Sequence, residues 1–125
     1  MARNYDWKTG CAVEATLAVV GGRWKPVLLF HLLDGPKRFG ELRRLTPNAT
    51  ERMITLQLRE LEADGVIVRE VFPVVPPHVE YRLTPFGHSL KSLLIQMRDW
   101  GEAFKRERQA GAGDDQAGAA TGELA

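Results

Sequence analysis

The side chains best suited to chemistry are basic residues that gather in one stretch of this chain. They are Lys37, Arg38, Arg43, Arg44, Arg52 and Arg59, and only two acids, Glu41 and Glu51, lie among them. Clustered cations attract phosphate, and an arginine can also form two hydrogen bonds with a guanine edge. The cluster therefore indicates a nucleic-acid partner, with a solvated charged surface as the alternative interpretation.

The formal net charge of +1 hides this cluster because acids gather near the C-terminal end. Residues 110–125 hold Asp114, Asp115 and Glu123 but no Lys or Arg. The rest of the chain is more basic than the total suggests, and its bases are concentrated locally, as a phosphate-binding surface requires.

Cys11 is the second candidate for chemistry and the only cysteine. It stands three residues before Glu14 at the start of a predicted helix, like a capping box with sulfur in place of oxygen. The positive end of the helix dipole favours the reactive thiolate there, although Glu14 opposes it. One interpretation is a redox sensor that forms a disulfide with a partner chain or with a low-molecular-weight thiol. The alternative interpretation is a small core residue that never reacts, and a small-molecule effector held near Trp24 is a third hypothesis.

Little in the sequence indicates catalysis. His31, His78 and His88 lack metal-ligand spacing, and Cys11 has no histidine nearby in sequence to act as a base. We therefore expect no enzyme activity, no metal and no cofactor. The longest apolar run, residues 27–33, is too short to span a bilayer, and no apolar leader follows Met1, so we expect a cytoplasmic protein without membrane contact.

The elements that must position these residues follow from hydrophobic periodicity and from turn residues. Helices are predicted over residues 13–20, 24–33, 39–45 and 50–64, strands over residues 66–72 and 79–83, and a last helix of about five turns from Thr84-Pro85. Residues 37–39 could pair as an edge strand. A proline-rich loop at residues 73–77 joins the two strands. This order predicts an α+β, mostly α fold, in which one helix lies in a DNA groove beside a hairpin.

Two ungapped stretches carry a resemblance to a known family. They are residues 11–14 with 21–25 (Cys-Ala-Val-Glu and Gly-Gly-Arg-Trp-Lys) and residues 59–65 (Arg-Glu-Leu-Glu-Ala-Asp-Gly), followed by residues 76–81 and Leu83-Thr84. Over residues 11–104 the chain resembles HxlR-type transcription regulators, which are related to the MarR group of winged helix-turn-helix repressors. It departs from the family pattern at Ala12, Glu51, Leu56 and His78.

The resemblance implies a homodimer that binds inverted repeats near the genes it controls, with the cysteine at Cys11 sensing oxidants or electrophiles in some members. It also implies a winged helix-turn-helix domain with a long C-terminal dimerisation helix. We expect residues 1–10 to form a flexible arm, residues 11–109 the DNA-binding and dimerisation domain, and residues 110–125 a disordered tail.

Specific roles follow for the helix over residues 50–64, the candidate recognition helix. Arg52 can contact guanine, Thr55 a base edge or phosphate, and Leu56 a thymine methyl. Of the neighbours Tyr81 and Arg82, only one can face the DNA, and Arg82 is favoured. The predicted DNA-binding residues are Lys37, Arg38, Arg43, Arg44, Thr50, Arg52, Thr55, Leu56, Arg59 and Arg82.

The last helix has more apolar positions than a domain of this size needs. A two-fold dimer would use this surplus and would place two reading helices about one DNA turn apart. The predicted interface residues are Leu90, Leu94, Met97, Trp100 and Phe104. The alternatives are packing of this stripe onto residues 13–33, and a winged helix that docks on proteins instead of DNA.

Overall fold

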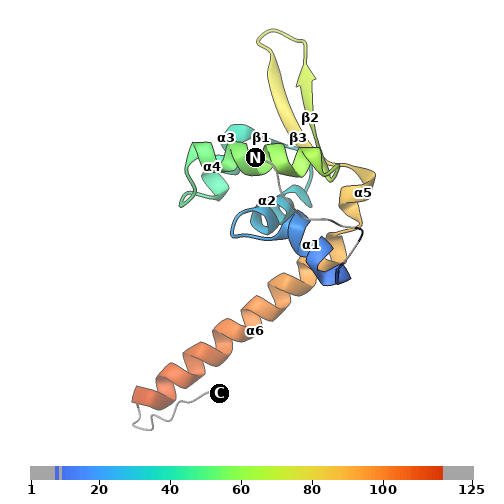
Figure 1. The fold of residues 1–125 in the computed structure, drawn as a ribbon. Coiled ribbons are helices and arrows are strands. Elements are labelled where there is room, and N and C mark those ends of the chain that lie inside the picture. Colours follow the sequence, from blue (N-terminus) through green and yellow to red (C-terminus); the bar gives the residue numbers. More distant parts are fainter. Residues whose placement is uncertain (1–7, 9, 117–125) are drawn as a thin grey trace. The chain divides into compact units, whose positions relative to one another are not determined.

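The computed structural model describes residue 8 and residues 10–116 (Figure 1). The elements in chain order are α1 (Ala12–Val20), α2 (Lys25–Leu32), β1 (Lys37–Arg38), α3 (Phe39–Leu45), α4 (Glu51–Ala63), β2 (Ile67–Phe72), β3 (His78–Leu83), α5 (Pro85–His88) and α6 (Lys91–Gln116). Contacts divide the chain into two compact units, residues 1–91 and 92–125. The mostly helical fold with a small antiparallel sheet confirms the predicted class.

Helices α1 and α2 form where the sequence predicts them. Helix α1 ends at Val20, and Gly21 is its C-cap. Gly22 follows with φ +89°, a backbone conformation that suits glycine. Helix α2 buries Leu28, Leu29 and Leu32, as expected for a helix that is apolar on most sides.

Helices α3 and α4 form a helix-turn-helix over a shared core. Leu42 of α3 and Ile54, Leu58 and Leu61 of α4 are at most 1% exposed. Thr50 caps α4 as predicted, since its hydroxyl accepts a hydrogen bond from the Met53 amide at 3.0 Å. The caps and the apolar stripe thus fix which face of α4 remains outside the core.

The three strands form an antiparallel sheet in the order β1-β3-β2. Ile67 pairs with Leu83, and both are buried. Because side chains alternate along a strand, the residues in step with this pair, such as Arg69 and Tyr81, share its face. The hairpin of β2 and β3 projects beyond the helices of its unit, as a wing does (Figure 1).

The segment after the wing differs from the single last helix predicted from Thr84-Pro85. Thr84 and Pro85 instead begin the four-residue helix α5, and α6 begins at Lys91. Between them, Ser89 and Leu90 donate to carbonyls three residues earlier, at 3.1 and 3.0 Å. These tighter bonds and the low helix propensity of Gly87 and Ser89 interrupt the α-helical pattern.

Helix α6 extends farther than predicted. Residues 110–116 are helical, whereas the sequence suggested a tail from Ala110. Once preceding turns exist, each added residue gains one backbone hydrogen bond, and Gln109 and Ala110 favour helix. The rest of the predicted tail, residues 117–125, lies outside the described residues, as do residues 1–7 and 9 of the predicted arm. None of the helices described here is both long and apolar enough to cross a membrane.

Candidate nucleic-acid interface

A groove of about 630 Å³ runs between α4 and the sheet and contains most of the predicted reading residues. Its lining is Phe39, Glu51, Arg52, Thr55, Leu56, Arg59 and Tyr81. A neighbouring hollow shares Thr55, Arg59 and Tyr81 and adds Leu58, Glu62 and Arg69. We call the combined surface the α4–wing groove.

The exposed side of α4 supplies the groove with donors and apolar surface. Arg52 and Arg59 are exposed and Thr55 is half-buried, while Leu56 is 36% exposed. This side is opposite the buried stripe that anchors α4 to the core. The predicted cluster of Arg52, Thr55, Leu56 and Arg59 is therefore brought together in one place.

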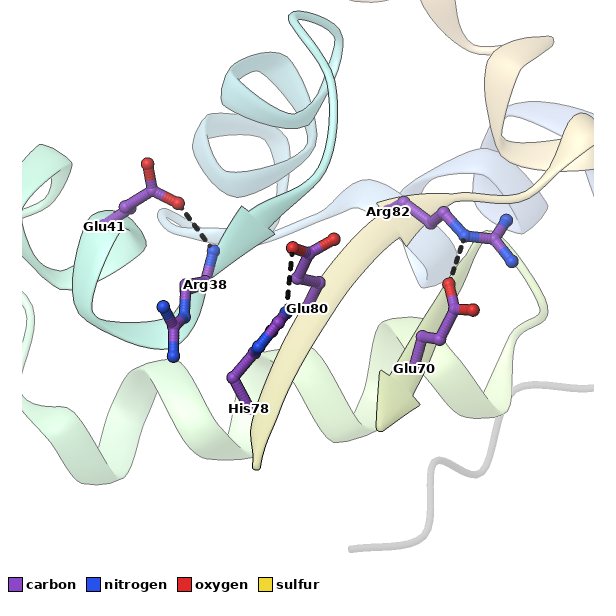
Figure 2. Close-up of polar contacts among 6 residues, drawn as sticks. All are labelled: Arg38, Glu41, Glu70, His78, Glu80 and Arg82. Atoms are coloured by element: carbon purple, nitrogen blue, oxygen red, sulfur yellow. Dashed lines mark hydrogen bonds and ion pairs between the residues drawn. The ribbon is translucent and has the colours of Figure 1, made fainter. Parts of the chain in front are cut away.

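The wing contributes Tyr81 to the groove, and Arg82 lies on the other face of the sheet. Tyr81 pairs with Arg69 on the groove face, whereas Arg82 pairs with Val68. The Arg82 side chain forms an ion pair with Glu70 at 3.1 Å (Figure 2). Strand alternation thus turns Tyr81, and not Arg82, toward α4, and the DNA contact of Arg82 stays a prediction.

Arg69 and Tyr81 were missed as a pair by the sequence interpretation. The signal was present in the strand alternation: Arg69 lies two residues after the buried Ile67, and Tyr81 two residues before the buried Leu83. Their common face could have been deduced once the register between the strands was known. The sequence alone does not fix that register across a long proline-rich loop.

The outer face of the wing carries its acids. Glu70 and Glu80 lie directly opposite each other, an arrangement that is unfavourable for like charges. Arg82 pairs with Glu70, and His78 Nε2 lies 3.3 Å from Glu80 Oε2 (Figure 2). His78 also stacks on Phe72 with ring centroids 4.6 Å apart. The two wing carboxylates therefore share a face of the sheet with Arg82, and Arg69 lies on the other face with Tyr81.

The remaining predicted bases surround α3. Arg43 and Arg44 are exposed and line a hollow with Gly40, Pro47 and Ala49. Arg43 also lies 3.3 Å from Glu51, so part of its charge is balanced. Lys37 is half-buried and the Arg38 side chain is exposed, while the Arg38 amide donates to Glu41 at 2.8 Å (Figure 2).

Cys11 is exposed and occupies the N-cap position of α1, as predicted. Its carbonyl accepts the first helical hydrogen bond from the Glu14 amide at 2.8 Å. The sulfur makes no capping hydrogen bond, so the predicted sulfur version of a capping box does not form. Sulfur is a weak acceptor compared with a hydroxyl oxygen.

Within residues 8 and 10–116, no group of three His, Cys, Asp or Glu side chains is placed to hold a metal ion. Burial, and then the positive charge of Lys37, lower the pKa of His31 below its ordinary value, while Asp34 acts in the opposite direction. His31 is half-buried on α2 and does not line the α4–wing groove.

The five predicted interface positions are not alike in the structure. Met97, Trp100 and Phe104 are 41%, 69% and 43% exposed, whereas Leu94 is buried and Leu90 is half-buried. The rings of Trp100 and Phe104 stack with their centroids 5.4 Å apart. Together with Met97 they form an exposed apolar strip along α6. On α1, Val13 and Leu17 are 62% and 58% exposed.

A helix-turn-helix whose second helix shares a cationic groove with a β-hairpin defines a winged helix-turn-helix protein. The sequence model of the HxlR-like helix-turn-helix family matches residues 19–109, and the chain belongs to this family of transcriptional regulators.

Relatives and solved structures agree with this assignment. The HTH-type transcriptional regulator YdeP of Bacillus subtilis (strain 168) is 60% identical over 96 residues, which cover 77% of this chain and 75% of YdeP. The structure titled "Redox regulator HypR in its oxidized form" is 58% identical, with a TM-score of 0.73 over 74% of this chain and 96% of that one. The reduced form of the regulator YodB from B. subtilis is 33% identical, with a TM-score of 0.67 over 77% and 95%. The chain is thus similar to regulators that include two studied in different redox forms.

Proposed function

We propose that this protein is a cytoplasmic, sequence-specific DNA-binding repressor that acts as a homodimer on an inverted-repeat operator. The observation that carries the proposal is the α4–wing groove, whose lining includes Arg52, Arg59 and Arg69 beside the carboxylates Glu51 and Glu62. Such local positive charge is what a phosphate-lined groove attracts.

Each groove residue has a role that its position supports. Arg52 lies near the N-terminal end of α4, the end that contacts base edges in helix-turn-helix proteins. Thr55 and Leu56 follow on the same side, suited to a base edge and a thymine methyl. The residues proposed to contact phosphate are Lys37, Arg38, Arg43, Arg44, Thr50, Arg59 and Arg69.

Homodimerisation is proposed from exposed apolar side chains. Met97, Trp100 and Phe104 recur at i, i+3 and i+7 on one side of α6, and large aromatic side chains are favoured at the centre of interfaces. Val13 and Leu17 on α1 offer further exposed apolar surface. A two-fold dimer would present two copies of α4 to two half-sites and so would require a palindromic operator.

Redox control through Cys11 is proposed as the regulatory input. Cys11 is exposed at the N-terminus of α1, where the helix dipole favours a thiolate. Two thiols that form a disulfide, either between protomers or with a low-molecular-weight thiol, lose two electrons and two protons to an oxidant such as diamide. The new bond would displace α1 and change the spacing of the two reading helices.

A footprint of the upstream intergenic DNA tests this function. We expect reduced protein to protect two half-sites whose centres lie about 34–36 Å apart, or a multiple of that distance. Diamide should remove the protection, and a reducing agent should restore it. A protected single site without dyad symmetry would contradict the dimeric part of the proposal, and protection that is insensitive to diamide would contradict the redox part.

A further inference from the structure

A buried ion pair joins α2 to α4, the proposed reading helix. Lys25 Nζ lies 2.5 Å from Glu60 Oε1, and the two side chains are only 5% and 13% exposed. Two arginine–carboxylate pairs of the same unit are far more open: the side chains are 44% and 42% exposed in Arg82–Glu70, and 53% and 63% exposed in Arg43–Glu51. Lys25–Glu60 is thus a buried ion pair, whereas the two arginine pairs lie at the surface.

The position of Lys25 is unfavourable on its own. It is the first residue of α2, where the positive end of the helix dipole repels a cation. It is also buried, so that its charge has lost most of its hydration. Replacement of a buried ion pair by apolar side chains of similar size is often neutral or stabilising in proteins. A gain in stability therefore does not explain the pair, whereas a fixed direction between two helices does.

We propose that Lys25 is a positioning residue that sets the rotation of α4 about its axis through Glu60, and so aims the groove side chains at DNA; this inference rests on the function proposed above. Ile54, Leu58 and Leu61 anchor α4 to the core, but apolar contacts are not directional. Apolar packing alone leaves tolerance in helix orientation: among proteins, the crossing angles between packed helices scatter by about 15–20°. A charged hydrogen bond is directional and short, so it selects one orientation.

The size of the effect follows from helix geometry. Side-chain tips lie roughly 5–6 Å from a helix axis, so a rotation of about 20° moves them by about 2 Å. A hydrogen bond to a base edge spans only about 2.7–3.2 Å. Glu60 directly follows Arg59 and lies four residues after Leu56 on the same helix. A rotation of α4 that is fixed at Glu60 therefore also fixes the direction of Arg59, Leu56 and the other groove residues on α4. Non-specific phosphate contacts tolerate such a shift better, because they depend on charge more than on direction.

The test compares affinity for the operator with affinity for a random duplex in the full-length protein. The central variant is Lys25→Met/Glu60→Leu, which replaces the pair with apolar side chains of similar size and is expected to remain folded. Lys25→Met alone removes the ammonium group that lies against the Glu60 carboxylate, and it serves as the second variant. Glu70→Gln breaks the exposed pair with Arg82 and is the matched control.

We expect the double variant to keep wild-type resistance to urea but to lose about tenfold to a hundredfold of its preference for the operator. Its affinity for random duplex should change less than about twofold, and Glu70→Gln should leave both affinities unchanged. Amide hydrogen exchange should also rise across α4 in Lys25→Met.

A double variant with the wild-type preference, or a Lys25→Met protein with unchanged exchange in α4, would overturn the inference. If wild-type protein shows no operator preference, the proposed function fails, and the exchange measurement still decides whether Lys25 orders α4.

Discussion

At the scale of single residues, Arg52 and Arg82 form a natural comparison, because both are exposed arginines and they lie on opposite sides of the wing. Arg52→Ala should weaken operator binding by about 1–3 kcal/mol and relax discrimination at one base pair, since a bidentate base contact is lost. Arg82→Ala should change affinity far less, because this side chain pairs with Glu70. Binding titrations over operators mutated at single positions measure both effects, and equal losses in the two variants would contradict the assignment of the groove face.

Cys11 supports a second prediction at this scale. Cys11→Ser keeps a small polar side chain at the N-cap of α1 and should retain full DNA binding. It should also remain bound when diamide is added, because a hydroxyl cannot form a disulfide. The measurement is a gel-shift titration of diamide on both proteins. Release of Cys11→Ser at the same diamide concentration as wild type would show that the thiol is not the sensor.

His31 gives a pH dependence with a defined sign. Its pKa is lowered in the folded state by burial first and Lys37 second, so the unfolded chain binds a proton more readily. The free energy of unfolding contributed by His31 is fully present above the ordinary pKa of 6.5. It is lost as pH falls through the lower folded-state pKa.

Urea unfolding at several pH values between about 5 and 7 measures this slope. His31→Gln, which cannot be protonated, should reduce the loss of stability in acid. An identical slope in wild type and variant would contradict the effect of burial on His31.

The sequence identified which residue types would meet on α4 but not how the wing would face it. Arg52, Thr55, Leu56 and Arg59 follow from a helical period that needs only local information. The choice between Tyr81 and Arg82 depends on the pairing of β2 with β3 across residues 73–77, which is a non-local property. The ion pair between Lys25 and Glu60 is also non-local, since the two residues are 35 positions apart in the chain.

At the scale of secondary-structure elements, α4 depends on the cap at Thr50. Thr50→Ala removes the acceptor for the Met53 amide and should cost about 0.5–2 kcal/mol of stability. Thr50→Ser keeps the hydroxyl and should cost much less. Urea unfolding at one fixed protein concentration measures both changes, since a dimer's stability depends on concentration. Equal stability in the alanine and serine variants would show that the cap does not hold α4 in place.

The predicted boundaries of the helices agree with the structure where a capping residue or a glycine marks the start or the end of a helix. Gly22, Thr50 and Gly65 each mark an end that the structure reproduces. The junction between α5 and α6 was missed because Thr84 and Pro85 are a valid helix start and the break depends on three-residue hydrogen bonds at Ser89 and Leu90. The spacing of apolar residues does not show where hydrogen bonds change from four-residue to three-residue spacing.

At the scale of the whole molecule, the exposed apolar strip of α6 predicts the oligomeric state. A monomer has a mass of 14.0 kDa, and we expect light scattering to give twice this value. Trp100→Glu should shift the particle toward monomer, because a buried unpaired charge opposes association. Glu102→Gln, on the same helix, is the control. A wild-type particle with the mass of one chain would rule out the dimer.

The central claim is that the groove distinguishes one DNA sequence from others, and the ratio of two dissociation constants tests it most directly. Reduced wild-type protein should bind its own upstream DNA at least about 10³-fold more tightly than a random duplex at physiological salt. Both affinities should fall steeply with added salt, because bound phosphates release counterions. Equal affinity for the two duplexes, measured with intact quaternary state and reduced Cys11, would contradict the account.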